Sequence, residues 1–191
     1  LGVGLYLPAA AAEPLAARRE SAAGFREFLA QAGLFAFTAN AFPYGGFHGE
    51  RVKETVYRPD WTTPRRLEYT LTVARGLAAL IEPGQTGTVS TLPGSWKAWG
   101  MDEGRLMAMA DNLLAAANAL DRLREETGRT LVLCLEAEPG CVLETTAETV
   151  SFFNHRLLGR HVPEAVVRRH LGVCLDTAHL AVQFEEPATA I

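Results

Sequence analysis

The sequence lacks the features of membrane-spanning and nucleic-acid-binding proteins. No apolar run reaches the ~18 residues expected of a transmembrane helix. No run of Lys and Arg is long enough to follow a phosphate backbone, and the formal net charge is −4. We therefore expect neither stable membrane insertion nor nucleic-acid binding.

Cysteine is scarce and its spacing is uninformative. The cysteines are odd in number and form no close pair, so they do not indicate a disulfide framework or a zinc knuckle; they are Cys134, Cys141 and Cys174. The opening LGVGLYLPAAAAEPLAARRE has no basic segment before its apolar part, so it is typical of a strand and a helix rather than a signal peptide. These features predict a protein of the reducing cytoplasm.

Several catalytic signatures are also absent. Neither G-x-G-x-x-G nor a P-loop follows the first apolar run, so no motif supports nucleotide binding. There is no G-x-S-x-G, so a serine hydrolase of that kind is unsupported.

The chain does contain five short apolar runs that alternate with longer helical patterns. This alternation predicts a parallel sheet with helical crossovers, in an α/β fold. Either an open doubly wound sheet or a (β/α)8 TIM barrel would fit. The runs are Leu1–Leu7, Leu34–Phe42, Thr86–Leu92, Thr130–Leu135 and Leu171–Leu175.

The helical patterns have recognisable ends. Pro14 is expected to open the first helix, Thr63 to cap the second before Pro64, and Gly128 to end the third. Thr145 and Glu148 have capping-box spacing. We expect helices over residues 14–33, 64–81, 103–127, 146 onward, 163–170 and 187 onward. Residues 1–191 are interpreted as one TIM-barrel domain, incomplete at both ends, because a barrel needs ~250 residues.

Two segments, LVLCLEAEPG (131–140) and LGVCLDTAH (171–179), share one design. Each is an apolar strand that ends in a carboxylate. Alternation places Glu136 on the face of Cys134, and Asp176 on the face of Cys174. If that face points into a barrel, both acids lie at its C-terminal rim, within roughly 5–8 Å of each other. The two cysteines would be buried and reduced one layer below.

Two neighbouring buried acids are costly unless a cation compensates them. A divalent metal held by Glu136, Asp176 and His179 is the metal-site hypothesis, and Glu138 is a further acid in the same loop. The alternative, that these acids cap helices or pair with arginine, stays open.

Two loops are candidates for substrate contact. The loop PYGGFHGERVKETVYRPDWTT carries His48, and the next loop carries Trp96 and Trp99. Long loops at strand ends are often functional, and we expect the first loop to carry His48 to the mouth of the barrel. A solvated His48 and tryptophans that only pack over the rim are the alternatives.

The sequence also resembles known families. GVCLDTAH is similar to a metal-ligand segment of endonuclease IV, and LEAEPG is similar to a strand end of the xylose-isomerase-like superfamily. FTANAFPYGGFHGERVKETVYRPDW, STLPGSW and LEAEPGCVLETT resemble the EboE family of metabolite traffic proteins. The resemblance implies a TIM barrel in which Glu136, Asp176 and His179 match metal or substrate positions. The superfamily's Cys-Thr-Asn-x-His-type strand and its last two strands are absent here, so the metal sphere would be incomplete.

Three functions follow as hypotheses. The first is a metal-dependent isomerase or epimerase of a sugar, a sugar phosphate or another small polyhydroxylated or carbonyl metabolite, with Zn, Mn, Mg or Co as cofactor. Glu138, His48 or His179 would move the proton. The second is a non-catalytic metabolite-binding or traffic protein, and the third is an endonuclease IV-like phosphodiesterase, against which the acidic balance argues.

Overall fold

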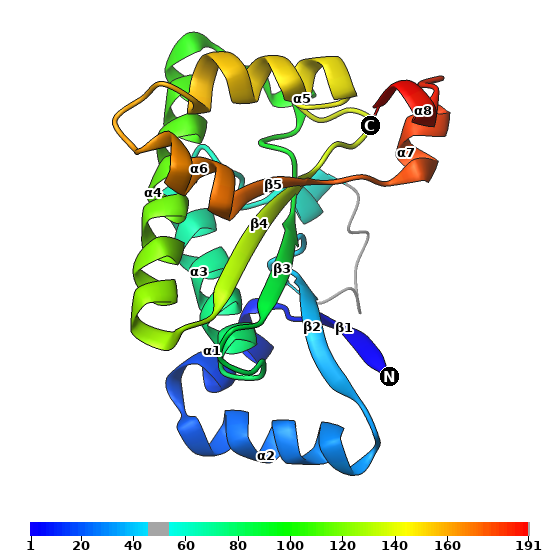
Figure 1. Cartoon of the computed structure of the whole chain (residues 1–191). Coiled ribbons are helices and arrows are strands. Elements are labelled where there is room, and N and C mark those ends of the chain that lie inside the picture. Colours follow the sequence, from blue (N-terminus) through cyan, green and yellow to red (C-terminus); the bar gives the residue numbers. More distant parts are fainter. Residues whose placement is uncertain (46–53, 191) are drawn as a thin grey trace.

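The computed structural model describes residues 1–45 and 54–190, and its centre is a five-stranded sheet (Figure 1). The strand order is β1-β2-β3-β4-β5, and every neighbouring pair is parallel. The parallel sheet predicted from β-α alternation is confirmed. The strands are β1 (Gly2–Tyr6), β2 (Phe35–Asn40), β3 (Thr86–Thr91), β4 (Thr130–Glu136) and β5 (Leu171–Cys174).

Helices connect the strands, and short 3-10 or π turns lie in three of the connections. The predicted bounds of α4 are confirmed, and the helix ends because Gly128 adopts a left-handed conformation with φ 68°. The helices are α1 (Ala9–Ala17), α2 (Arg19–Gln31), α3 (Pro64–Ala78), α4 (Glu103–Thr127), α5 (Thr146–Phe152), α6 (Glu164–His170), α7 (Thr177–Val182) and α8 (Pro187–Ala190), with turns η1 (Glu54–Tyr57), η2 (Lys97–Trp99) and η3 (Phe153–Leu157).

Two predictions about helix starts need correction. Pro14 lies inside α1, which begins at Ala9 because the alanine-rich run before the proline has high helix propensity. The chain then becomes extended at Arg18, so α2 is a separate helix. Thr63 does precede α3, but its hydroxyl donates to the carbonyl oxygen of Asp60 at 2.9 Å instead of capping the helix.

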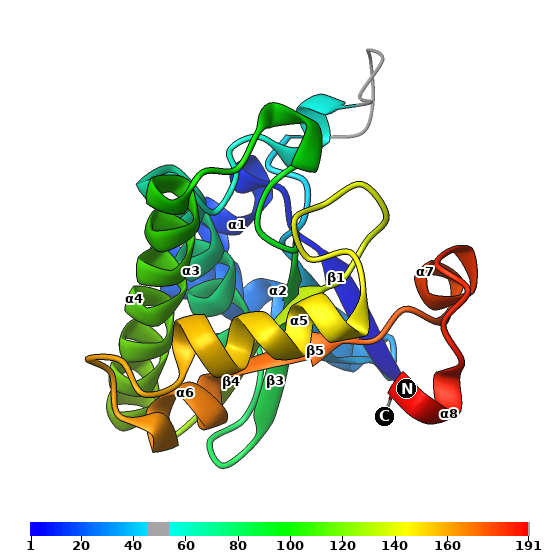
Figure 2. The same cartoon turned by 90° about the horizontal axis from the view of Figure 1, so that it is seen from above.

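The two faces of the sheet differ in burial. On β4, Leu131, Leu133 and Leu135 are buried, whereas the alternate residues, including Cys134, are half-buried. Helices α3, α4 and α6 contact the sheet, and both views place α7 and α8 on its other side (Figures 1 and 2). No described helix packs across that second face, so it is only partly shielded from solvent. We call it the open face.

Because this face is open, two cysteines on it are less buried than predicted. Cys134 and Cys174 are free thiols, as predicted, but both are half-buried rather than buried. The burial prediction was therefore wrong, because it assumed a closed barrel interior. None of the helices in the described part of the chain has the length and apolar character needed to cross a membrane.

Candidate metal centre

The site forms where β4 and β5 end side by side. Glu136 is the last residue of β4 and lies opposite Cys174 in the register. β5 ends at Cys174, and Asp176 becomes the N-cap of α7. Its Oδ1 accepts hydrogen bonds from the backbone N–H groups of Ala178 at 2.7 Å and His179 at 3.2 Å. The helix-capping alternative is thus correct for Oδ1, and Oδ2 remains for another partner.

Three predicted metal ligands lie together. Glu136, Asp176 and His179 each offer one ligand atom, and these atoms all lie within 4.8 Å of one another. The two carboxylates are therefore slightly closer than the predicted separation. The structure brings together side chains from two strand ends and the first turn of α7.

The orientation of His179 suits a ligand. Its Nδ1 lies 3.0 Å from the carbonyl oxygen of Ala137, which can only accept a hydrogen bond. Nδ1 therefore carries the proton, and the lone pair is on Nε2. Nε2 faces Oδ2 of Asp176 at 3.9 Å. Such a backbone contact is how metal-binding histidines are usually held.

Burial and like charge both act on the acids. Burial raises the pKa of Glu136, the negative charges of Asp176 and Glu138 raise it further, and His179 acts in the opposite direction. Burial also raises the pKa of Glu138, whose hydrogen bond from Tyr57 opposes the shift. A cation beside these carboxylates would offset the cost of their ionisation.

Glu138 is held by the loop that follows β2. Its Oε1 accepts a hydrogen bond from the Tyr57 hydroxyl at 3.1 Å, and its Oε2 is buried with no partner among the described residues. Sequence reasoning did not single out Tyr57 as a site residue. Its position in a long strand-end loop was the one available signal for a role at the site.

The tryptophans pack against the same loop. Trp96 is half-buried and stacks on Tyr57 with ring centroids 4.7 Å apart. Trp99 carries the guanidinium of Arg58 over its face at 4.0 Å. The packing alternative therefore describes both rings, and their contact with substrate stays a prediction. His48 falls outside the described residues, so its role also stays a prediction.

A hollow adjoins two of the three candidate ligands. Its volume is about 230 Å³, and Asp176 and His179 lie in its wall together with Cys174. The remaining wall is largely apolar, with Val173 and Leu175 contributing. A small molecule bound there would be next to Asp176 and His179.

No family model matches the sequence, and no curated protein matches it. Among solved structures, the crystal structure of a xylose isomerase domain protein from Planctomyces limnophilus matches with a TM-score of 0.55 and 18% identity. The fold of this chain is therefore similar to that of a xylose isomerase domain protein. The match covers 94% of this chain and 55% of that chain, so this chain spans about half the length of the solved protein.

A hydroxysteroid dehydrogenase from Escherichia coli also matches, with a TM-score of 0.34, 15% identity, and coverage of 92% of this chain and 68% of that chain. That similarity is too low to support an argument. The xylose-isomerase-like match supports the predicted α/β fold, and its low identity carries no information about substrate or metal.

Proposed function

We propose that Glu136, Asp176 and His179 bind a divalent cation, and that the protein is a metal-dependent isomerase or epimerase of a small polyhydroxylated or carbonyl metabolite. The observation that carries the proposal is the approach of three ligand atoms to within 4.8 Å of one another. They lie at the C-terminal ends of parallel strands, where sites of this fold class are built.

The donor set fits such a cation. Two carboxylate oxygens and one neutral imidazole nitrogen suit Zn²⁺ or Mn²⁺ better than Mg²⁺, which prefers oxygen ligands alone. The contact of His179 Nδ1 with Ala137 leaves Nε2 available. The backbone bonds to Asp176 use Oδ1 and leave Oδ2 available.

Glu138 is the proposed proton carrier. Burial raises the pKa of Glu138 in the direction of neutral pH, and a general acid or base works best when its pKa is near the operating pH. Tyr57 donates to Oε1, and Oε2 has no partner among the described residues, so Oε2 is the oxygen that would carry the proton. When bound, the metal would polarise a carbonyl or hydroxyl oxygen of the substrate.

We further propose that the five strands are part of a (β/α)8 barrel of the EboE-like kind. The sequential parallel strand order, the packing of α3, α4 and α6 against the sheet and the extent of the xylose isomerase domain match support the barrel, and the sequence resemblance described above supports the EboE-like kind. In a closed barrel the open face would become the interior, and further strands would complete the metal sphere.

The first experiment is a titration of chelator-treated protein with Mn²⁺ or Zn²⁺ by calorimetry. We expect one site, and Asp176→Asn should weaken binding by ~100-fold or more, since a ligand mutation removes a direct bond. Asparagine is as good an N-cap as aspartate, so the melting temperature of the metal-free variant should not change. Glu20→Gln, an exposed acid on α2, is the matched control. Equal affinity in Asp176→Asn would refute the metal site.

The second experiment tests catalysis on the metal-loaded protein. Trial ketoses and aldoses are incubated in D2O, and proton exchange is followed by NMR. We expect exchange that Glu138→Gln abolishes while metal affinity is retained. Tight sugar binding without exchange would instead indicate a metabolite traffic protein, and cleavage of abasic DNA would indicate a phosphodiesterase.

A further inference from the structure

A second hollow lies at the same end of the sheet, in the loops that follow β2 and β3. Its volume is about 570 Å³, and its wall includes Tyr44, Arg58, Asp60, Arg65 and Arg105. Three of these five residues carry a guanidinium group. Nothing in the proposed metal chemistry uses them.

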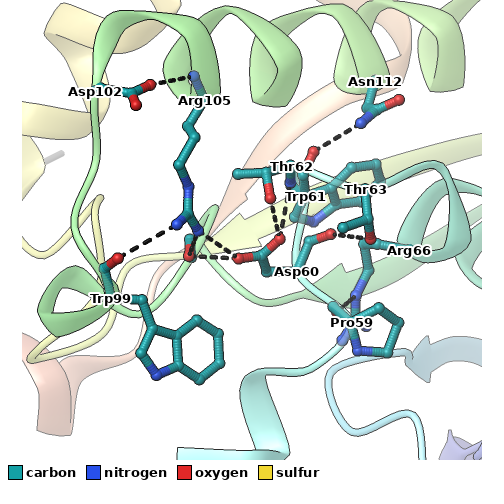
Figure 3. A network of polar contacts seen from close by, with 11 residues as sticks. Pro59, Asp60, Trp61, Thr62, Thr63, Arg66, Trp99, Asp102, Arg105 and Asn112 are labelled. Carbon is teal, nitrogen blue, oxygen red and sulfur yellow. Dashed lines mark hydrogen bonds and ion pairs between the residues drawn. The ribbon is translucent and has the colours of Figure 1, made fainter.

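The one carboxylate in this wall is already neutralised. Asp60 is 5% exposed, and Arg105 reaches from α4 to its Oδ2 at 3.3 Å (Figure 3). Ser95 donates to the same oxygen at 2.5 Å, and Thr62 donates to Oδ1 from both its backbone and its hydroxyl. Asp60 therefore has little capacity left to attract a cation or to repel an anion.

Two guanidinium groups have no acidic partner. Within the described residues, neither Arg58 nor Arg65 forms an ion pair. Arg58 lies over the Trp99 ring at 4.0 Å, and Arg65 lies over the Tyr44 ring at 4.7 Å and donates to its hydroxyl at 3.2 Å. Stacking on aromatic faces restrains both groups while leaving their N–H edges available.

Acidic residues near Arg65 do not cancel its charge. Glu13 and Glu68 line another hollow that shares Tyr44 and Arg65 with this one. In the part of the chain that the structure describes, neither acid comes within ion-pair distance of Arg65. The charge of Arg65 is therefore available to a ligand.

A buried arginine adds to the positive potential. Arg66 is 0% exposed and donates to the carbonyl oxygen of Pro59 at 2.6 Å (Figure 3) and to that of Ala41 at 2.7 Å. Its described hydrogen-bond acceptors are all carbonyl oxygens, and it lies over the Tyr69 ring at 5.3 Å, so within the described residues its charge has no direct counter-ion. Nε of Arg105 is also buried without a partner among the described residues. Three guanidinium groups thus line the hollow together with one satisfied carboxylate, and a fourth is buried beside Pro59 in its wall, which gives the hollow a field that favours anions.

We propose that this hollow binds the phosphate group of a small phosphate monoester. Guanidinium forks match phosphate oxygens bidentately, and a dianion balances the two unpaired arginines. The volume exceeds that of inorganic phosphate, so an organic part of the ligand also fits. The proposal concerns residues separate from the metal ligands and does not depend on the proposed function.

The test is calorimetric titration of metal-free protein with inorganic phosphate and with glycerol 3-phosphate at physiological NaCl. Metal-free conditions prevent phosphate from binding through a cation. We expect one saturable site, and Arg58→Gln and Arg65→Gln should each weaken it by roughly tenfold, because each removes a charge-assisted contact. Asp176→Asn should bind phosphate like the unmodified chain, which separates this site from the metal centre.

Arg75→Gln is the matched control, because Arg75 is an exposed arginine on the same helix as Arg65. It should change phosphate affinity by less than twofold. Absence of saturable binding, or equal weakening by Arg75→Gln, would overturn the proposal. Tighter binding of malonate than of either phosphate would assign the hollow to carboxylates and overturn the phosphate assignment. Circular dichroism of each variant shows whether it is folded.

Discussion

At the residue scale, Gly140 combines two constraints in the loop that follows β4. Its φ is 84°, and an added Cβ would lie 2.4 Å from the Trp96 ring. We predict that Gly140→Ala lowers the free energy of unfolding by about 2–4 kcal/mol, from backbone strain plus overpacking. Urea denaturation of the two proteins measures this difference in the free energy of unfolding.

Gly159 is the control for that substitution. It also has a positive φ, 71°, but nothing lies within 4 Å of an added Cβ. Gly159→Ala should therefore cost only the backbone term, about 1 kcal/mol. Equal losses in the two variants would contradict a contribution from the Trp96 contact.

The thiols differ in accessibility. Cys141 is 0% exposed, and burial, together with the charges of Glu138 and Glu144, raises the pKa of its thiol. Burial raises the pKa of both thiols, but Cys141 is fully buried and Cys174 is only half-buried, so we predict that iodoacetamide modifies Cys141 more slowly than Cys174. Peptide mapping by mass spectrometry at pH 7 and pH 9 measures both rates. Raising the pH should accelerate Cys141 modification in urea but not in the native protein, and rapid native modification would contradict the burial.

At the element scale, the start of α5 shows local sequence acting as predicted. The Thr145 hydroxyl accepts from the Glu148 backbone at 3.2 Å, and the Glu148 carboxylate accepts from the Thr145 backbone at 3.1 Å. We predict that Thr145→Ala lowers the free energy of unfolding by about 1 kcal/mol. Thr145→Ser keeps the hydroxyl and should lose less than half of that. A serine variant as unstable as the alanine variant would show that methyl packing, rather than capping, matters at this position.

Thr63 shows the limit of the same reasoning. It has the sequence of an N-cap, with Pro64 following, yet its hydroxyl turns to the carbonyl oxygen of Asp60. The cause is tertiary: the chain before α3 folds so that Asp60 reaches Ser95 and Arg105 on other elements. The sequence predicted where the helix starts but could not predict the partner of the hydroxyl.

At the scale of the whole molecule, a bound metal would join β4 to α7. Ligand that binds only the folded state stabilises it by about 2.7 kcal/mol at 100 times the Kd. We predict that saturating Mn²⁺ or Zn²⁺ raises the melting temperature by about 5–10 °C. Asp176→Asn should abolish this shift, and Glu20→Gln should retain it. Differential scanning calorimetry with and without chelator is the measurement.

The sheet also presents apolar surface. Phe35 and Phe37 flank the buried Ala36 on β2, are 55% and 47% exposed, and have ring centroids 6.3 Å apart. Contiguous apolar surface binds hydrophobic dyes. We predict that replacing both phenylalanines by serine reduces anilinonaphthalene sulfonate fluorescence.

Phe184→Ser is the comparison, since Phe184 is 97% exposed but isolated from that pair. It should leave the fluorescence nearly unchanged. Dye binding that is insensitive to the double substitution would place the apolar site elsewhere.

The sequence by itself determined the strands, their parallel order and the grouping of Glu136, Asp176 and His179. These depend on the alternation of apolar residues and on chain direction, since parallel strands bring their carboxyl ends to one edge. Tertiary structure alone decided the contact of Tyr57 with Glu138, the half-burial of Cys134 and the arginine hollow. Tyr57 meets Glu138 across 81 residues of sequence, and Arg105 meets Asp60 across 45. Side-chain directions at such separations depend on how whole elements pack, which no local pattern of residues encodes.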